Sequence, residues 1–261
     1  MIKRETILAQ NPWLTDVSVV AETTSTQLDA KDDLVDKKLF IAEMQTQTRG
    51  RFGRQYFASN GDGIYMSLVL KISDDVKDYT ILTAAAVLSA IENLTSKKPL
   101  VKWVNDIYLD NKKICGILVE HLLSSNSIII GVGLNFNISN FPIALREKAG
   151  SLFTNETPTI TRESLIAEIW SQFNRLSTSQ DFFEIYKSHS FILGKTVEFE
   201  ESGRTIIGTA TDLTETGELI VNSDGLVKVL SSGEISLKKW LLSYLSRIFL
   251  LSLKRRVMQP L

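Results

Sequence analysis

The sequence predicts an α+β protein in which a larger domain of sheet and helices precedes a small antiparallel β-barrel. Two observations support this fold class. Residues 1–190 alternate long helix-like stretches with apolar, β-branched segments, whereas the strands expected after residue 195 are short and separated by Ser-Gly, Thr-Gly and Asp-Gly turns. We therefore expect one domain at 1–190, a second at 191–237 and a separate tail at 238–261.

Five segments of the first domain have the composition of strands. A short apolar run, "LFIAE", leads into an arginine-rich loop, and "GIYMSLVLK" follows that loop. Three further segments are apolar and β-branched enough to form central strands, and "LDNKK" reads as a tight turn between the first two of them. The expected strands are residues 39–43, 63–71, 100–103, 113–123 and 127–138.

Two helices are expected in the same domain. Residues 78–94 are rich in Ala and Leu and long enough for a buried helix. In residues 161–177 apolar side chains recur at helical spacing, and Glu163 lies in the first turn, where the helix dipole favours an anion. The recurring side chains are Leu165, Ile166, Ile169, Trp170, Phe173 and Leu176.

The second domain and the tail differ sharply in composition. "TVEFE", "RTIIGTATDL", "GELIVNS" and "VKVL" are short strands of a barrel of roughly 45 residues. The tail holds an apolar stretch at 240–253, shorter than the roughly 20 residues that a membrane span needs. Two interpretations stay open: a terminal helix packed on the body or on a partner subunit, and an interfacial membrane helix flanked by basic residues.

Charge and composition argue against several classes of function. The 261 residues hold 29 Lys and Arg against 30 Asp and Glu, whereas proteins that coat nucleic acid by charge alone are usually more basic. The single cysteine, Cys115, excludes a disulfide framework, and two histidines disfavour a histidine-rich metal centre. The first residues, "MIKRETILAQNPW", lack the apolar run of a signal peptide, so we expect a cytoplasmic protein.

The arginine-rich loop, "TRGRFGR" at residues 48–54, is a candidate anion site. Its glycines allow backbone N–H groups to approach a ligand closely, and arginine can grip a carboxylate or phosphate with two hydrogen bonds. The loop is neither a P-loop, since no Gly-Lys-Ser/Thr follows, nor a dinucleotide fingerprint, since it precedes a strand. A solvated basic loop is the alternative.

Hydroxyl and amide side chains gather in "ETTSTQ" at residues 22–27. Ser25 or Thr26 could cap the helix that starts at "QLDAK", or the same helix start could contact a polar, uncharged ligand. In "GVGLNFN", at residues 131–137, two glycines interrupt an apolar strand. They indicate either close approach by a ligand or another backbone, or a bulge in a packed sheet.

The stretch "VKWVNDIYLDNKKICGILVE" combines cations, an amide and a carboxylate. Neighbouring side chains of a strand point to opposite faces, so at most one of Lys112 and Lys113 can face a given pocket. A lysine buried beside "ICGILV" needs an anionic partner. Asn105 and Asp106 could instead form an Asx turn. Cys115 lies in mid-strand and is expected to be an inert buried thiol.

Taken in order, five motifs resemble those of the biotin–protein ligases. They are "TTSTQ", "AEMQTQTRGRFGR", "VKWVNDIYLDNKKICGILVE", "GVGLNFN" and "GEISL", and the resemblance spans roughly residues 20–237. It implies a mixed-sheet catalytic domain with helices on the sheet, followed by an SH3-like barrel. It also implies that biotin and Mg-ATP form biotinyl-5′-AMP, from which biotin passes to a lysine of a biotin carboxyl carrier protein.

The resemblance also implies roles for individual residues. Lys113 and Arg51 are the catalytic pair, acting through their charge rather than as nucleophiles. The residues implied to contact biotin are Ser25, Thr26, Gln27, Gln45, Arg49, Gly50, Arg51, Lys113 and Gly116. Those implied to contact ATP or the adenylate are Arg49, Arg51, Arg54, Trp103, Asn105, Asp106 and Asn135. No magnesium ligand is assigned, and the protein could be a monomer or a homodimer.

Three departures from the family pattern stand out. Thr48 replaces the first glycine of the loop, Gln27 stands where Asn is usual, and Val104 where Pro is common. About twenty residues precede the first motif, too few for a winged helix-turn-helix, so we expect a monofunctional ligase without sequence-specific DNA binding. A lipoate–protein ligase and a non-enzymatic binder of anionic surfaces are the competing hypotheses.

Overall fold

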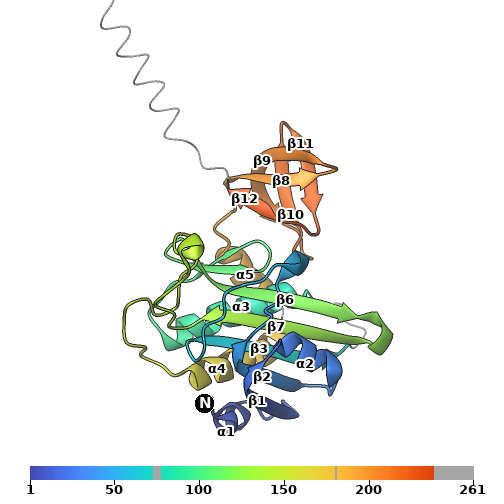
Figure 1. The fold of residues 1–261 in the computed structure, drawn as a ribbon. Helices are drawn as coiled ribbons and strands as arrows, with labels where there is room; N and C mark the ends of the chain where they lie inside the picture. Colours follow the sequence, from blue (N-terminus) through green and yellow to red (C-terminus); the bar gives the residue numbers. More distant parts are fainter. Residues whose placement is uncertain (73–77, 180, 238–261) are drawn as a thin grey trace, which may run out of the picture. The chain divides into compact units, whose positions relative to one another are not determined.

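A computed structural model describes residues 1–72, 78–179 and 181–237 (Figure 1). The chain divides into two compact units. Among the described residues, the first unit comprises Met1–Phe191 together with Leu213–Gly217, and the second comprises Ile192–Asp212 and residues 218–237. The short segment Leu213–Gly217, which the sequence places in the small domain, thus clusters with the first unit. The predicted tail at 238–261 lies outside the described residues.

The first unit contains a mixed seven-stranded sheet of order β1-β2-β3-β7-β6-β5-β4. The β1–β2 pair is parallel and the other pairs are antiparallel. The strands are β1 (Asp16–Thr23), β2 (Lys38–Gln45), β3 (Gly63–Lys71), β4 (Leu100–Lys102), β5 (Asp106–Leu109), β6 (Lys112–Leu122) and β7 (Ser127–Asn135). The predicted strands at 39–43, 63–71, 113–123 and 127–138 are confirmed, with β7 ending earlier than expected.

The sheet differs from the prediction in two ways. Residues 100–103 were expected to form a central strand, but β4 lies at the edge of the sheet, because β5 is its only strand partner in the described part of the chain. The sequence also did not predict β5, which pairs with β6 through a hairpin. Asp110 and Asn111 close that hairpin with φ of 50° and 64°, as a two-residue turn of the primed type requires.

Helices cover both faces of this sheet. On one face, Ala30 of α2 packs with Phe40, Val69 and Ile129. On the other, Trp170 of α4 donates its indole N–H to Met66 Sδ at 3.2 Å. Because Met66 and Val69 differ in parity along β3, α2 and α4 lie on opposite faces. The helices are α1 (Arg4–Gln10), α2 (Thr26–Asp32), α3 (Tyr79–Leu94), α4 (Arg162–Ser177) and α5 (Asp181–Ser188).

The two longest helices begin as the sequence predicts, each with a side-chain cap. Asp78 accepts hydrogen bonds from the backbone N–H groups of Thr80 and Ile81 at the start of α3. Thr161 and Ser164 form a reciprocal capping box at the start of α4. Three short 3-10 turns complete the described helical structure of this unit: η1 (Arg51–Gly53), η2 (Leu123–Ser125) and η3 (Ile143–Leu145).

The second unit is a five-stranded antiparallel sheet of order β11-β10-β9-β8-β12. Its predicted strands are confirmed, and the Ser202–Gly203 and Asp224–Gly225 turns have positive φ at both residues. The strands are β8 (Thr196–Glu201), β9 (Arg204–Leu213), β10 (Leu219–Ser223), β11 (Leu226–Leu230) and β12 (Ile235–Leu237). Within the described part of the chain, no helix is long and apolar enough to cross a membrane.

Candidate active site

A patch of glycines interrupts the α2 face of the central sheet. Gly116 of β6 pairs with Gly133 of β7, and Gly131 lies two residues before Gly133 on the same face. A Cβ at Gly131 would lie 2.6 Å from Gln27 Oε1, and one at Gly133 would lie 3.2 Å from the Tyr56 ring. Side chains from other elements therefore occupy the space above these glycines, which agrees with the close-approach interpretation rather than the bulge.

The start of α2 supplies buried, uncharged polar groups beside this patch. Ser25, Thr26 and Gln27 are all less than 4% exposed. The Thr26 backbone N–H donates to Gln45 Oε1 at 2.7 Å, and the Thr26 hydroxyl lies 2.9 Å from Ser67 Oγ. Ser25 takes the N-cap position, but its hydroxyl makes no capping hydrogen bond. The capping hypothesis is thus correct for position and wrong for the side chain.

Gln45 and Thr48 connect the arginine-rich loop to the sheet. Gln45 Nε2 donates to the Tyr56 hydroxyl at 2.5 Å. Thr48 Oγ1 accepts from the Tyr56 N–H at 2.8 Å and donates to the Tyr56 carbonyl at 2.6 Å. Inside the loop, the Gly50 N–H donates to the Arg54 carbonyl at 2.7 Å. Thr48, the departure from the family's glycine, therefore closes the neck of the loop with two hydrogen bonds.

Cationic side chains lie at the other end of the glycine patch. Lys113 Nζ lies 2.6 Å from Asp106 Oδ1 and 3.2 Å from the Cβ position of Gly116. Arg51 donates to Asn105 Oδ1 at 3.1 Å, and Asn105 donates to the Ile117 carbonyl at 2.9 Å. The expected anionic partner of the strand lysine is thus Asp106. Since Asp106 opens β5, the β5–β6 hairpin brings this pair together.

The remaining candidate residues do not join this constellation. Arg49 and Arg54 are exposed, and Arg49 has no ion-pair partner among the described residues. Trp103 is buried, and its indole N–H donates to the Gly217 carbonyl at 2.9 Å. Asn135, at the end of β7, donates to the Gly150 carbonyl at 2.9 Å. Gly50 lies in the loop, and its N–H bonds the Arg54 carbonyl.

Lys112 and Lys113 face different surroundings, as predicted, and a register shift between β5 and β6 at Ile107/Tyr108 places Lys113, three residues before Gly116, on the glycine side. Lys112 points away from the glycine patch, and its ammonium donates to the Arg146 carbonyl at 2.7 Å. Cys115 is almost completely buried, and burial raises the pKa of its thiol to about 12. The thiol therefore stays protonated near neutral pH, as expected for an inert buried cysteine.

Two residues at the site were missed by sequence reasoning. Ser67 is a hydroxyl inside the otherwise apolar β3, and it donates to Gln27 Oε1 at 2.9 Å. Tyr56 follows the arginine-rich loop by two residues and covers Gly133. A lone serine within nine residues of strand was the available signal for Ser67. No local feature distinguishes Tyr56 from the other aromatic side chains near it.

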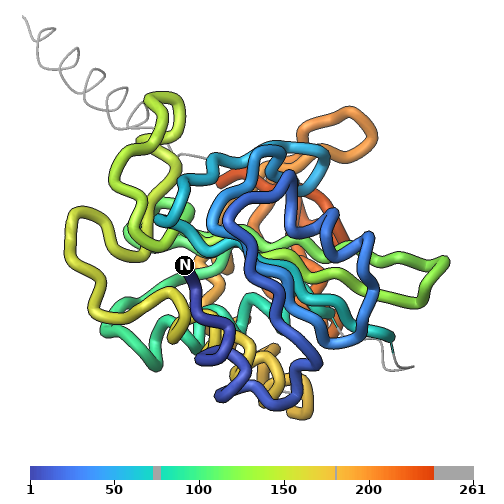
Figure 2. The backbone as a smooth tube through the Cα atoms, turned by 60° about the horizontal axis from the view of Figure 1, so that its bottom comes forward, coloured from blue at the N-terminus to red at the C-terminus, as the bar shows by residue number. Residues whose placement is uncertain are grey.

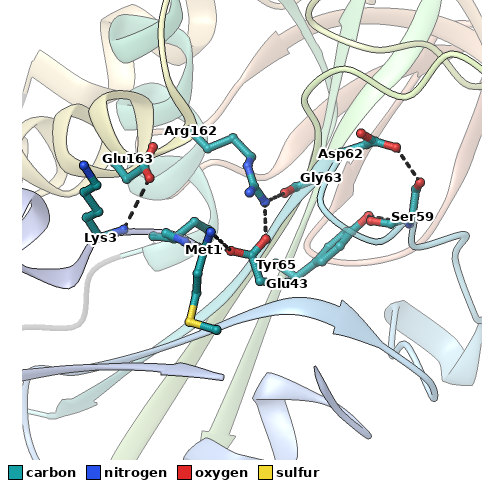
Figure 3. Close-up of polar contacts among 10 residues, drawn as sticks. Met1, Lys3, Glu43, Ser59, Asp62, Gly63, Tyr65, Arg162 and Glu163 are labelled. Atoms are coloured by element: carbon teal, nitrogen blue, oxygen red, sulfur yellow. Dashed lines mark hydrogen bonds and ion pairs between the residues drawn. The ribbon is translucent and has the colours of Figure 1, made fainter. Parts of the chain in front are cut away.

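A buried ion pair joins β2 to the start of α4 (Figure 3), close to the N-terminus that Figure 2 marks on the backbone. Glu43 of β2 pairs with Arg162 at the start of α4 at 2.6 Å, and Glu43 also accepts from the Ile2 N–H at 2.7 Å. Arg162 donates in addition to the Gly63 carbonyl, where β3 begins. The chain terminus, two strands and α4 are thus held together at one point.

The side chains of the described residues do not form a ready-made metal-binding site. No group of three or more His, Cys, Asp or Glu side chains that could hold a metal ion occurs among the residues that the structure describes. A magnesium ion held mainly by substrate phosphates needs only one or two protein carboxylates. Asp106 is the carboxylate nearest to the cationic end of the patch, and in this structure it is paired with Lys113.

Comparison with known proteins assigns these features to a family. The Biotin/lipoate A/B protein ligase family matches residues 17–137, and the Biotin protein ligase C terminal domain matches residues 192–238. The chain belongs to the biotin–protein ligase family. The first match contains the start of α2, the arginine-rich loop, Lys113 and the glycines of β7, so the constellation described above lies within the family's catalytic domain.

Individual biotin–protein ligases resemble the chain over most of its length. The Bifunctional ligase/repressor BirA of Bacillus subtilis is 28% identical over 247 residues, which cover 88% of this chain and 75% of that protein. The Biotin--[acetyl-CoA-carboxylase] ligase of Mycobacterium tuberculosis is 26% identical over 250 residues, 89% of this chain and 92% of that protein. These relatives confirm the predicted family and enzyme class.

A solved biotin–protein ligase also shares the fold. The biotin protein ligase from Aquifex aeolicus in complex with biotin and ATP matches with a TM-score of 0.74 and 25% identity, over 86% of this chain and 99% of that chain. The predicted fold class, a mixed-sheet catalytic domain with a small C-terminal β-domain, is confirmed.

Proposed function

We propose that this chain activates biotin with ATP to biotinyl-5′-AMP and then transfers biotin to a lysine of a biotin carboxyl carrier protein. The observation that carries the proposal is the arrangement around the glycine patch. Buried, uncharged groups of Ser25, Thr26 and Gln45 lie at one end, and Arg51 and Lys113 lie at the other. This arrangement suits a ligand with a polar neutral ring and a carboxylate tail.

The first step joins two anions. The biotin carboxylate attacks the α-phosphorus of Mg-ATP, a phosphoanhydride bond breaks, and pyrophosphate leaves. Fixed cations must offset the repulsion between the carboxylate and the phosphate. Lys113 and Arg51 supply them, with Lys113 contacting both groups electrostatically. Arg49 and Arg54 reach the adenylate in this proposal when the loop closes over it, together with Trp103, Asn105, Asp106 and Asn135.

The ureido ring of biotin explains the neutral end of the site. A ureido group carries two N–H donors and a strong carbonyl acceptor but no charge, so hydroxyl and amide partners satisfy it. Among the described residues, no hydrogen bond uses the Ser25 hydroxyl, so its proton is available to a ligand acceptor. The backbone of Gly50 and the bare surface of Gly116 leave room for the chain that links ring and carboxylate.

In the second step, a carrier lysine attacks the acyl carbonyl of the mixed anhydride and AMP leaves. Closure of the arginine-rich loop keeps water away from that anhydride. The proposal places the protein in the cytoplasm, where ATP and carboxylase carrier domains are available. We propose no sequence-specific DNA binding for these 261 residues, and a mobility-shift assay at physiological salt tests that part.

The decisive experiment separates biotin from lipoate. The protein is incubated with Mg-ATP, an acceptor carrier domain and either acid, and the acceptor is weighed by mass spectrometry. We expect addition of biotin alone. Addition of lipoyl groups alone would instead support the lipoate–protein ligase hypothesis and overturn this proposal.

A second measurement tests the non-enzymatic hypothesis, in which the loop binds an anionic surface. Lys113→Ala removes the charge beside Gly116 and leaves the three loop arginines in place. We expect this variant to lose biotinylation while any binding to anionic vesicles stays unchanged. Loss of both together would contradict a catalytic role for Lys113.

A further inference from the structure

Gln27 is positioned to organise the hydroxyl groups of the proposed biotin site. Its Nε2 donates to the Ile129 carbonyl at 3.4 Å, and its Oε1 accepts from Ser67 Oγ at 2.9 Å. A carbonyl can only accept, so the NH2 group of Gln27 must face Ile129. Both polar atoms of this buried amide are thus used inside the protein.

The direction of the remaining hydrogen bonds follows from this orientation. A serine hydroxyl has a single proton, and Ser67 gives it to Gln27. At the 2.9 Å contact between Thr26 Oγ1 and Ser67 Oγ, Ser67 can therefore only accept. Gln45 Oε1 accepts from the Thr26 backbone N–H at 2.7 Å and from the Thr26 hydroxyl at 3.2 Å, so the single proton of that hydroxyl is used inside the protein. Thr26 Oγ1 is left as an acceptor toward any ligand, and a ureido N–H is the matching donor.

The longer side chain of Gln27 also explains Gly131. A Cβ at residue 131 would stand 2.6 Å from Gln27 Oε1, which is too close for a carbon and an oxygen, so the Gln27 amide would have to move. The Leu118 carbonyl of β6, 3.4 Å from the same position, is at an ordinary contact distance and can stay in place. Any side chain at position 131 would therefore displace the Gln27 amide from Ser67.

We infer that Gln27 is a positioning residue that fixes Thr26 as the acceptor for a substrate N–H, and that Gly131 provides the space this glutamine needs. The inference rests on the proposed function, since it names the ureido nitrogen as the group recognised. Gln27 does not contact the ligand in this arrangement; it acts through Ser67 and Thr26. This revises the direct role in biotin binding that the family resemblance implies for Gln27.

A double-mutant cycle tests the inference. Gln27→Asn shortens the amide by one methylene, so it cannot reach both Ser67 and Ile129. Gly131→Ala displaces the full-length amide. We expect each single variant to raise the KM for biotin in ATP–pyrophosphate exchange by about tenfold to a hundredfold, the usual effect of losing a buried hydrogen bond, with little change in kcat. In the Gln27→Asn/Gly131→Ala double variant, the second change should have no further effect.

Two further variants serve as a second test and as a control. Ser67→Ala breaks the same chain of hydroxyls and should raise the KM for biotin as Gln27→Asn does. Ser127→Ala, at a buried serine of β7 that bonds Lys71 and Ser125 instead, should lower only the melting temperature. Multiplicative effects of the two single changes on KM, or a fall in melting temperature with KM unchanged, would overturn the inference.

The outcome also separates this inference from the proposed function. A wild-type protein that forms no biotinyl adenylate would overturn the proposed function, and the inference would fall with it. The coupling between Gln27 and Gly131 can still be measured in the melting temperatures of the same four proteins without ligand. If the wild-type protein is active on biotin but the effects of the two single changes on KM multiply in the double variant, the inference alone is overturned.

Discussion

Lys112 and Lys113 are adjacent in sequence but contact different parts of the molecule. Lys113 lies above Gly116 and pairs with Asp106, whereas Lys112 bonds the Arg146 carbonyl. They therefore form a matched pair of variants. We expect Lys113→Ala to lower kcat for biotinyl-adenylate formation about a hundredfold to a thousandfold, because it removes a preorganised charge from the site.

The control for this prediction is Lys112→Ala, which leaves the same strand in place and removes a similar, half-buried lysine side chain. Its activity should stay within about twofold of wild type, as is usual for surface substitutions. The measurement is pyrophosphate exchange at saturating biotin and ATP. Equal losses in both variants would show that the strand, and not the Lys113 charge, is responsible.

Cys115 gives a second prediction at the scale of a single residue. Burial raises the pKa of its thiol to about 12, so almost no thiolate exists near neutral pH. Iodoacetamide should leave the native protein unmodified between pH 7 and about pH 9 and should modify it fully in denaturant. Mass spectrometry reads the outcome, and rapid alkylation of the native protein would contradict the predicted inert thiol.

At the scale of an element, the neck of the arginine-rich loop depends on Thr48. Its hydroxyl makes both hydrogen bonds to the Tyr56 backbone. Thr48→Val removes both without changing the shape of the side chain, and each is worth about 1 kcal/mol. We expect trypsin to cleave the native protein in the loop about tenfold faster or more in this variant.

Thr48→Ser keeps the hydroxyl and is the matched control for loop opening. Its cleavage rate should match that of wild type, and sequencing of the fragments should place the cut after Arg49, Arg51 or Arg54. If the serine and valine variants are cleaved at the same rate, the hydroxyl is not what closes the loop.

At the scale of the whole molecule, the Glu43–Arg162 pair ties the start of the chain to the sheet and to α4 (Figure 3). Burial alone would raise the pKa of Glu43, but the hydrogen bond and charge of Arg162 and the Ile2 N–H outweigh it and lower that pKa below 4.5. The pair therefore stabilises the fold fully above about pH 4.5, and this contribution is lost as pH falls through the folded pKa.

Arg162→Met should reverse this pH dependence. Removing one partner of a buried pair costs about 3–5 kcal/mol at neutral pH, because the Glu43 charge stays buried without compensation. In the variant, burial raises the pKa of Glu43, so Glu43 becomes protonated and neutral as the pH falls. The difference in melting temperature between the variant and wild type should therefore become smaller at acidic pH. Thermal unfolding between about pH 4 and pH 8 measures that difference. A difference that is constant across this range would contradict the assignment.

An exposed pair provides the control for this prediction. Lys98 is 77% exposed in its pair with Glu92. Such surface pairs contribute little to stability, so Lys98→Met should change the melting temperature by no more than about a degree or two at any pH. A large effect there would mean that surface charge in general, rather than the buried pair, governs acid stability.

Strongly patterned elements could be predicted from the sequence, and weakly patterned ones could not. Residues 63–71 and 161–177 carry enough apolar side chains at the right spacing to fix their type without knowledge of their partners. β5 holds only one fully buried side chain, Ile107, in four residues, so its pattern is too short to detect. The edge position of β4 depends on strand order, which no local pattern carries.

The sequence by itself determined which chemical groups this protein presents: hydroxyls and amides at 25–27, cations at 48–54 and at Lys113, and glycines at 116–133. These follow from residue type and local periodicity. Only the tertiary structure decided which groups meet. Gln27 reaches Ser67 and Ile129, 40 and 102 residues away, and Lys113 finds Asp106 through a hairpin that the sequence did not reveal. Such contacts depend on strand register and on the packing of distant segments, which residue type alone does not specify.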